Sequence, residues 1–148
     1  MDEPAPGGLE QVVVNPIWPL LASMFAGAWL AYPWFVLNSF ALGGRRRFVD
    51  LSIALGGLLL TALTLFVVAL LVQRGTVQEA HLPYFQLIPV GVRLVIFYLL
   101  FMRQEQSFAL YTYFGGKTRN AFLVVIAASF LKGKLLGDAP PIVQLLLG

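Results

Sequence analysis

Long runs of hydrophobic residues, separated by short polar stretches, dominate the chain. The clearest run extends from Leu51 to Val72 and contains no charged residue. At about 1.5 Å per residue, a helix of this length covers the hydrocarbon core of a bilayer, which is roughly 30 Å thick. This run therefore predicts a transmembrane helix at 51–72.

Two more runs have a length suited to crossing a membrane, at 16–42 and 84–102. The first contains Pro33, which removes a backbone hydrogen bond and predicts a kink in the second half of its helix. The other carries Arg93 at its centre. We expect each run to form one transmembrane helix, and the first helix to end at Gly43.

A fourth hydrophobic segment, at 119–136, is shorter. Its uncharged part, 121–131, reaches across a bilayer only if Arg119 and Lys132 extend their charged ends towards the two interfaces. We expect a fourth crossing here, and the alternative is an interfacial or re-entrant segment.

These runs together predict an all-α fold, namely an integral membrane helical bundle with three clear transmembrane helices and a fourth. The transmembrane domain would extend over residues 16–136. Residues 1–15 are acidic and contain proline and glycine, so they predict a flexible N-terminal tail. Residues 137–148 predict a short hydrophobic C-terminal tail.

The composition supports a membrane protein. Hydrophobic residues make up 59% of the 148 residues and charged residues only 11%, against about 45–50% and about 25% in soluble domains. A soluble domain of this size cannot enclose so much apolar surface. The basic residues that give the net charge of +3 are scattered between apolar runs, so we expect no nucleic-acid binding.

Lysine and arginine are unevenly distributed over the loops. The loop at 43–50 holds three arginines and the stretch at 103–119 holds three basic residues, whereas the tail before the first run holds none. Because basic loops tend to remain in the cytoplasm, both should be cytoplasmic and the N-terminus outside. A fourth crossing would then place Lys132 and Lys134 outside, which is evidence against that crossing.

Arg93 is the main candidate for a functional residue. A charge near the middle of a bilayer costs about 2.5–3.5 kcal/mol, so it should face a protein interior or a hydrated cavity. Gln86 lies seven residues earlier and shares its helix face. Arg93 could extend to an interface, bond carbonyls freed by Pro89 and Pro33, pair with a carboxylate of another subunit, or bind an anionic headgroup or small anion.

Asn38 is the second candidate, because its amide could hydrogen-bond across a helix contact. It shares a helix face with small residues of the first run, and the second run repeats the same small-residue spacing. Small residues at every fourth position let helix backbones approach closely. The residues expected to pack helices together are Ser23, Gly27, Ala31, Ser52, Gly56, Gly57 and Thr61.

Basic residues also gather at the cytoplasmic ends of the predicted helices. With Phe108, Tyr111 and Tyr113 nearby, they suit contact with anionic lipid headgroups. The residues expected to face these headgroups are Arg45, Arg46, Arg47, Lys117 and Arg119.

No combination of residues indicates catalysis or a metal site. His81 is the only histidine, cysteine is absent, and the serines lack a nucleophile motif. The few acid–base candidates would lie on opposite faces of the membrane. We therefore expect no enzymatic activity, no metal and no cofactor.

Several short motifs follow one another in a recognisable order. Gly27 and Asn38 precede Leu42-Gly43 and a basic turn, and a stretch with two glutamines (Gln104, Gln106) leads to Tyr113-Phe114-Gly115-Gly116-Lys117. In this order the chain resembles small, uncharacterised bacterial multi-span inner-membrane proteins of about four helices. The resemblance implies a helical bundle in a bacterial inner membrane, but no activity and no functional residue.

The short loops, the small-residue faces and an Arg93 without a carboxylate at its depth favour an accessory subunit of a membrane complex. Its partners would be the lipid bilayer and another membrane protein, or further copies of the chain. The alternative is a small oligomeric channel or transporter, in which Arg93 and Gln86 line an anion path.

Overall fold

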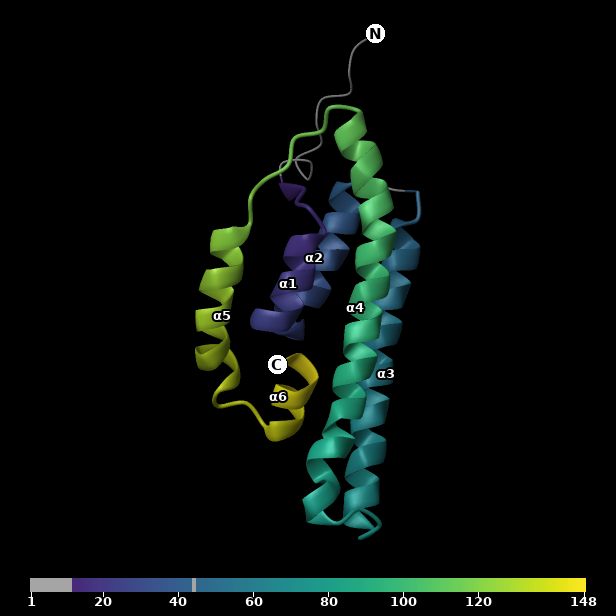
Figure 1. Cartoon of the computed structure of the whole chain (residues 1–148), viewed down its shortest axis with the longest axis vertical. Coiled ribbons are helices and arrows are strands. Elements are labelled where there is room, and N and C mark those ends of the chain that lie inside the picture. Colours follow the sequence, from purple (N-terminus) through teal and green to yellow (C-terminus); the bar gives the residue numbers. More distant parts are fainter. Residues whose placement is uncertain (1–11, 44) are drawn as a thin grey trace.

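The computed structural model describes residues 12–43 and 45–148, which are mainly helical (Figure 1). Apart from an isolated bridge between Val14 and Arg119, these ranges contain no β-strand. The prediction of an all-α fold is confirmed.

Two long antiparallel helices form one side of the molecule. α3 (Arg47–Gln73) and α4 (Leu82–Tyr113) are joined by a loop that contains the short 3-10 helix η2 (Glu79–His81). Within the described ranges, these are the two helices long and apolar enough to cross a membrane. They contain the predicted runs 51–72 and 84–102, whereas a third and a fourth helix of this kind are not confirmed.

A glycine of α3 lets α3 and α4 approach closely. Gly57 lies directly against Ile96 of α4, and a Cβ at position 57 would overlap with this side chain. Thr61, one turn later, is buried and donates its hydroxyl to Gly57 O (2.8 Å). By contrast, Ser52 and Gly56 lie on the exposed side of α3, so they do not contact another helix of this chain.

The first hydrophobic run forms two helices instead of one. α1 (Ile17–Phe25) and α2 (Ala28–Ala41) fold back on each other as an antiparallel hairpin (Figure 1). The chain reverses at Gly27, whose φ of +102° is rarely adopted by residues that carry a Cβ. The predicted single span at 16–42 with a kink at Pro33 is therefore wrong. Pro33 lies inside α2, and the break lies at the residue that can take a positive φ.

The last part of the chain forms two short helices. α5 (Phe122–Leu136) packs against α1, where Val125 and Ala128 join an apolar cluster. At about 1.5 Å per residue α5 is roughly 22 Å long, which is less than the thickness of the hydrocarbon core. α6 (Pro141–Leu147) lies beyond the tip of the α1–α2 hairpin (Figure 1), so the predicted tail at 137–148 contains a helix.

The first described residues lie at the same end of the molecule as the basic loops (Figure 1). The N–H of Arg119 donates to Val13 O (3.1 Å). The hairpin therefore returns the chain to the end from which its first described residues start, whereas the predicted orientation places the N-terminus and the basic loops on opposite sides of a membrane. Of the predicted tail at 1–15, residues 1–11 lie outside the described ranges.

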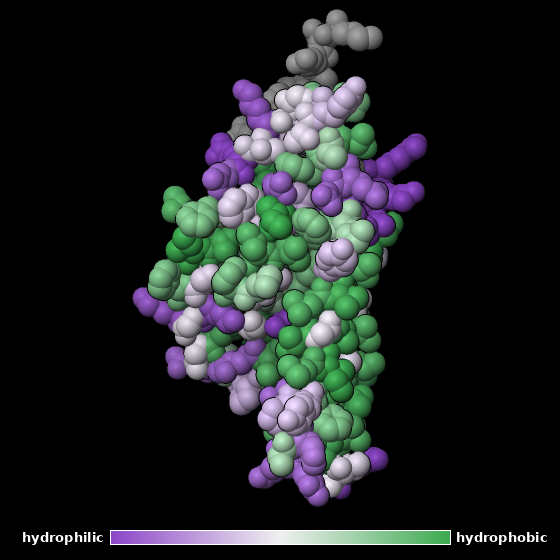
Figure 2. Space-filling model, in the orientation of Figure 1, coloured by the Kyte–Doolittle hydropathy of each residue, from purple (hydrophilic) through white to green (hydrophobic). Residues whose placement is uncertain are grey.

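An apolar core joins α2, α3 and α4. Tyr32 and Phe35 of α2 pack on Phe97 of α4, with ring centroids 4.6 and 5.8 Å apart. Small residues such as Ala31 and Ala54 bring the helices together around these rings. Outside this core, large apolar side chains cover α3 and α4, and Figure 2 shows them as a broad band between two hydrophilic ends.

We expect Gly27→Ala to lower the free energy of unfolding by about 1–3 kcal/mol, because the positive φ would be strained. The added Cβ would also meet Leu147 O and Gly148 O at 2.7 and 2.8 Å. Gly91→Ala is the matched control, since Gly91 is an exposed helical glycine with open space around it. It should keep or raise stability, by up to about 1 kcal/mol. Thermal unfolding in one detergent measures both, and a Gly27→Ala protein as stable as the parent would contradict the reversed turn.

Candidate functional site

Three segments meet at a buried pair of amide side chains near the basic end. Asn38 of α2 and Gln104 of α4 are 1% and 0% exposed. Asn38 Nδ2 donates to Gln104 Oε1 (3.1 Å), and Gln104 Nε2 donates to Phe35 O (2.6 Å). Asn38 Oδ1 accepts a hydrogen bond from Val14 N–H (3.0 Å). This amide cluster of Asn38 and Gln104 therefore joins both ends of the α1–α2 hairpin to α4.

An ion pair lies beside the amide cluster. Asp50 of α3 is buried, and its Oδ1 accepts from Arg103 Nε (2.7 Å) while its Oδ2 accepts from Ser39 Oγ (2.7 Å). Arg103 precedes Gln104 directly in α4, so both contacts fix the same turn of α4 against the other helices. Because both carboxylate oxygens of Asp50 are engaged, this group serves the packing of the helices.

Sequence reasoning identified Asn38 as a candidate for a bond across a helix contact but did not assign its partner. The signal that could have found Gln104 is the helical period, because the buried residues of α4 recur every three or four positions. Arg93 and Gln104 belong to the same face by this spacing. The buried residues of α4 are Pro89, Arg93, Phe97, Leu100 and Gln104.

Arg93 contacts the carboxyl end of α6. Arg93 is 9% exposed, and its Nη1 donates to Leu145 O and Leu146 O at 3.3 and 3.4 Å. Among the alternatives for Arg93, hydrogen bonds to backbone carbonyls are therefore present in the structure. They come from α6, however, and not from carbonyls freed by Pro89 or Pro33.

The three predicted polar candidates do not form one site. Asn38 contacts Gln104, which lies about 16 Å from Arg93 along α4 at 1.5 Å per residue. Gln86 is half-buried near the start of α4, and no side-chain hydrogen bond of Gln86 occurs within the described ranges. The face of α4 thus carries two separate polar levels, the amide cluster and Arg93.

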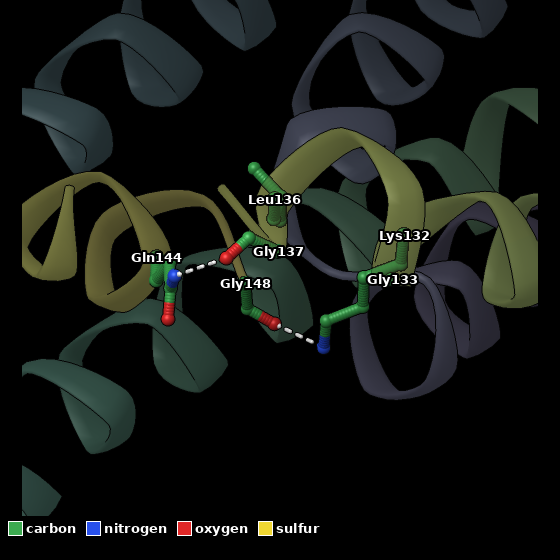
Figure 3. Close-up of a pocket in the computed structure, with 6 residues that line it drawn as sticks. All are labelled: Lys132, Gly133, Leu136, Gly137, Gln144 and Gly148. Atoms are coloured by element: carbon green, nitrogen blue, oxygen red, sulfur yellow. Dashed lines mark hydrogen bonds between the residues drawn. The ribbon is translucent and has the colours of Figure 1, made fainter. Parts of the chain in front are cut away.

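An open pocket of about 300 Å³ lies between α5 and α6 (Figure 3). Lys132 Nζ donates to Gly148 O (2.8 Å) across it. Gln144 Nε2 donates to Gly137 O (3.3 Å) and to Ala139 O (2.9 Å). The lysine and the glutamine of the pocket therefore bind backbone carbonyls of this chain and hold α6 against α5.

Most residues predicted to pack helices are buried. Ser23 turns its hydroxyl towards its own helix, where it donates to Leu20 O (2.6 Å). Gly27 forms the tip of the hairpin, and Ala31 lies in the apolar core. The buried members of the predicted set are Ser23, Gly27, Ala31, Gly57 and Thr61.

The predicted lipid-facing basic residues are exposed and belong to the two loops at one end of the molecule. The guanidinium of Arg47 lies over the rings of Phe40 and Phe48, 5.4 and 5.3 Å from their centroids. Such cation–π contacts keep a charged group beside apolar side chains. The exposed basic residues of this end are Arg45, Arg46, Arg47, Lys117 and Arg119.

Titratable side chains do not gather into a metal site in the part of the chain that the structure describes. No group of three or more His, Asp or Glu residues occurs there that could hold a metal ion. His81 lies exposed in η2, at the end opposite to the amide cluster (Figure 1).

We expect Gln104→Leu to lower the free energy of unfolding by about 1–3 kcal/mol, because the buried amide of Asn38 would lose its partner. Gln106→Leu is the control: the same substitution at an exposed position two residues away should change stability by less than about 0.5 kcal/mol. Replacing Asn38 and Gln104 together by leucine should cost less than the sum of the single changes. Denaturant unfolding in micelles measures the free energy of unfolding of both single leucine variants, the double variant and the control, each against the wild type. Strictly additive losses at Asn38 and Gln104 would contradict the shared hydrogen bond.

The chain matches no protein-family model, no curated protein sequence and no solved structure. Its function is therefore inferred from the geometry described above.

Proposed function

We propose that the chain is an integral membrane protein that acts as an accessory subunit by packing against another membrane protein within the bilayer. α3 and α4 cross the membrane as an antiparallel pair, while the α1–α2 hairpin and α5 enter from the basic end and stop part-way. The apolar surface of the two long helices and the hydrophobic composition of the chain support this arrangement.

The basic end faces the cytoplasm in this proposal. It carries Arg45 and Arg46 in one loop, Arg47 at the start of α3, and Lys117 and Arg119 in the other loop. The loop between α3 and α4 carries one arginine, Arg74, and no lysine. This asymmetry follows the positive-inside rule. The same residues bind anionic lipid headgroups, which attract basic residues next to membrane-spanning helices.

The observation that carries the proposal is that the apolar part of α5 ends well before it could cross a bilayer. Its uncharged stretch, 121–131, spans about 16 Å, whereas 51–72 in α3 spans about 33 Å at the same rise per residue. Lys132 and Lys134 therefore follow at a depth where α3 and α4 still expose apolar side chains. Figure 2 shows hydrophilic residues part-way along the molecule, level with the apolar band of the long helices.

Lipid alone does not stabilise the C-terminal end of α5. Lys134 is exposed, and a lysine facing hydrocarbon costs about 2.5–3.5 kcal/mol at the centre of a membrane. A second membrane protein with a carboxylate at this depth would remove that cost and would cover the apolar flank of α3 and α4. The exposed Ser52 and Gly56 would let another helix approach α3 closely.

In this proposal Lys134, and not Arg93, pairs with a carboxylate of the partner protein. Arg93 is buried within the chain, and its Nη1 binds carbonyls of α6. The expected carboxylate partner of Arg93 is therefore replaced by a carboxylate partner of Lys134.

An oligomeric anion channel is the second candidate. It is favoured by one observation, namely that the cations Arg93 and Lys132 both point at the carboxyl end of α6. It is disfavoured by the burial of Arg93 under α6, because an anion path along Arg93 requires α6 to move.

The proposed topology predicts the labelling of single cysteines, which the cysteine-free chain makes simple to read. Val12→Cys and Thr118→Cys should be modified by an impermeant thiol reagent from the same side of sealed vesicles, since both sites are exposed at the basic end. Thr76→Cys, exposed in the loop between α3 and α4, should be modified from the other side. Labelling of positions 12 and 118 from opposite sides would contradict the α1–α2 hairpin.

The accessory role predicts that charge reversal at Lys134 releases the partner. With a photo-reactive amino acid at Leu135, the wild-type chain in native membranes should cross-link to one defined membrane protein. Lys134→Glu should reduce the yield of this product about tenfold, which corresponds to roughly 1.4 kcal/mol of contact energy. Arg74→Glu, the same change at an exposed arginine of another loop, should leave the yield unchanged.

Three results would overturn this function. The cross-linked product could be absent, it could be insensitive to Lys134→Glu, or it could consist of two copies of this chain. The last result would replace the accessory subunit with a homo-oligomer.

A further inference from the structure

Two buried polar atoms have no hydrogen-bond partner within the ranges that the structure describes. They are the hydroxyl oxygen of Tyr32 and Nε of Arg93, in residues that are only 8% and 9% exposed. Buried polar groups without a partner are rare in native proteins, and each requires a physical explanation.

These two atoms belong to one place in the fold. The Tyr32 ring packs on Phe97, one turn from Arg93 on the same face of α4. The Tyr32 ring therefore lies about one helical turn from Arg93 along α4, and the electrostatics of its hydroxyl involve both Arg93 and Thr61 of α3. Thr61 already donates its proton to Gly57 O, which leaves its oxygen as an acceptor only. Donors from α2 and α4 thus converge between three helices.

The carboxyl end of α6 occupies the other edge of the guanidinium. Both hydrogen bonds of Arg93 start from Nη1, at the long distances of 3.3 and 3.4 Å. Carbonyls at the carboxyl end of a helix carry partial negative charge, so α6 offers Arg93 a substitute for an anion. The edge formed by Nε and Nη2 is the one that binds the two oxygens of a carboxylate in parallel.

α6 lies beside α3 and α2 but buries little of its surface there. No residue of α6 is buried. Besides Arg93, its end is held by the bond from Lys132 Nζ to Gly148 O (2.8 Å) and by the close approach of Gly27 at the hairpin tip. Short elements with little buried surface open at low free-energy cost compared with core helices.

We propose that Arg93 and Tyr32 form a binding site for a small carboxylate, and that α6 closes this site in the present conformation. The carboxylate accepts from Nε and Nη2 of Arg93 and from the hydroxyl of Tyr32. Its entry requires the end of α6 to move away, because α6 lies against the guanidinium through the bonds from Nη1 to Leu145 O and Leu146 O. This site is independent of the partner surface at Lys134.

The test uses the purified full chain in detergent with formate as the probe, and with bulky gluconate to hold the ionic strength constant. The thermal midpoint should rise with formate concentration and saturate, because a ligand that binds the folded state stabilises it. Tyr32→Phe removes only the hydroxyl and should weaken the apparent affinity by about tenfold. Tyr98→Phe, at an exposed tyrosine of α4, is the matched control and should bind formate as the wild type does.

Arg93→Lys keeps the charge but removes the planar fork, and it should abolish most of the saturable rise. A midpoint that does not respond to formate would overturn the site. So would a Tyr32→Phe or an Arg93→Lys protein with wild-type affinity. Either substitution alone suffices for this decision if the other protein fails to fold.

Closure by α6 has its own readout. Lys132→Met removes one of the contacts that hold the end of α6 and should tighten apparent formate binding several-fold, because a larger fraction of the protein is then competent to bind. An unchanged or weaker affinity in Lys132→Met would reject α6 as the element that closes the site.

Discussion

The position of the α1–α2 hairpin depends on the hydrogen bonds of one side chain, Asn38. Its amide accepts from Val14 N–H and donates to Gln104, so both ends of the hairpin are bound to the same turn of α4. In an apolar medium an unpaired amide or backbone N–H is costly, because neither lipid nor packed side chains can replace the lost partner. Once this cluster forms, the first segment has to return to the end from which it entered. Val13 then accepts a hydrogen bond from Arg119 N–H, α5 packs on the outside of α1, and the end of α6 meets the tip at Gly27.

Hydropathy predicted those helices that can be recognised from the length of an uncharged apolar run. The uncharged run at 51–72 is long enough to span a bilayer, and it lies in α3. The first run has a similar length, but it contains both Gly27 and Pro33, and hydropathy does not distinguish a kink from a reversal. The reversal follows from a backbone conformation, φ of +102° at Gly27, whereas a proline inside a helix removes only one hydrogen bond. The predicted orientation depends on the same distinction, since counting basic residues assumes that each run crosses once.

The candidate site was predictable only where side chains supply the contacts. Asn38 was identified because an amide in an apolar helix needs a partner, and the helical period of α4 places Gln104 on the face that meets it. The contact of Arg93 could not be found in this way. Its acceptors are the backbone carbonyls of Leu145 and Leu146, and every residue of the chain carries such a group. The same holds for Lys132, which binds the backbone of Gly148.

The two polar levels on one face of α4 differ in how completely their hydrogen bonds are satisfied, and this difference separates structure from function. In the amide cluster, the side-chain oxygen and nitrogen of both Asn38 and Gln104 form hydrogen bonds, at 2.6–3.1 Å. Around Arg93, the bonds are longer, and Nε and the Tyr32 hydroxyl have no partner among the described residues. A buried charge is costly at this depth, so a guanidinium with incomplete hydrogen bonds calls for a role beyond packing. Because the acceptors of Arg93 come from α6, a short helix without a buried residue, we assign that role to an anion bound at the edge of the guanidinium that α6 leaves free.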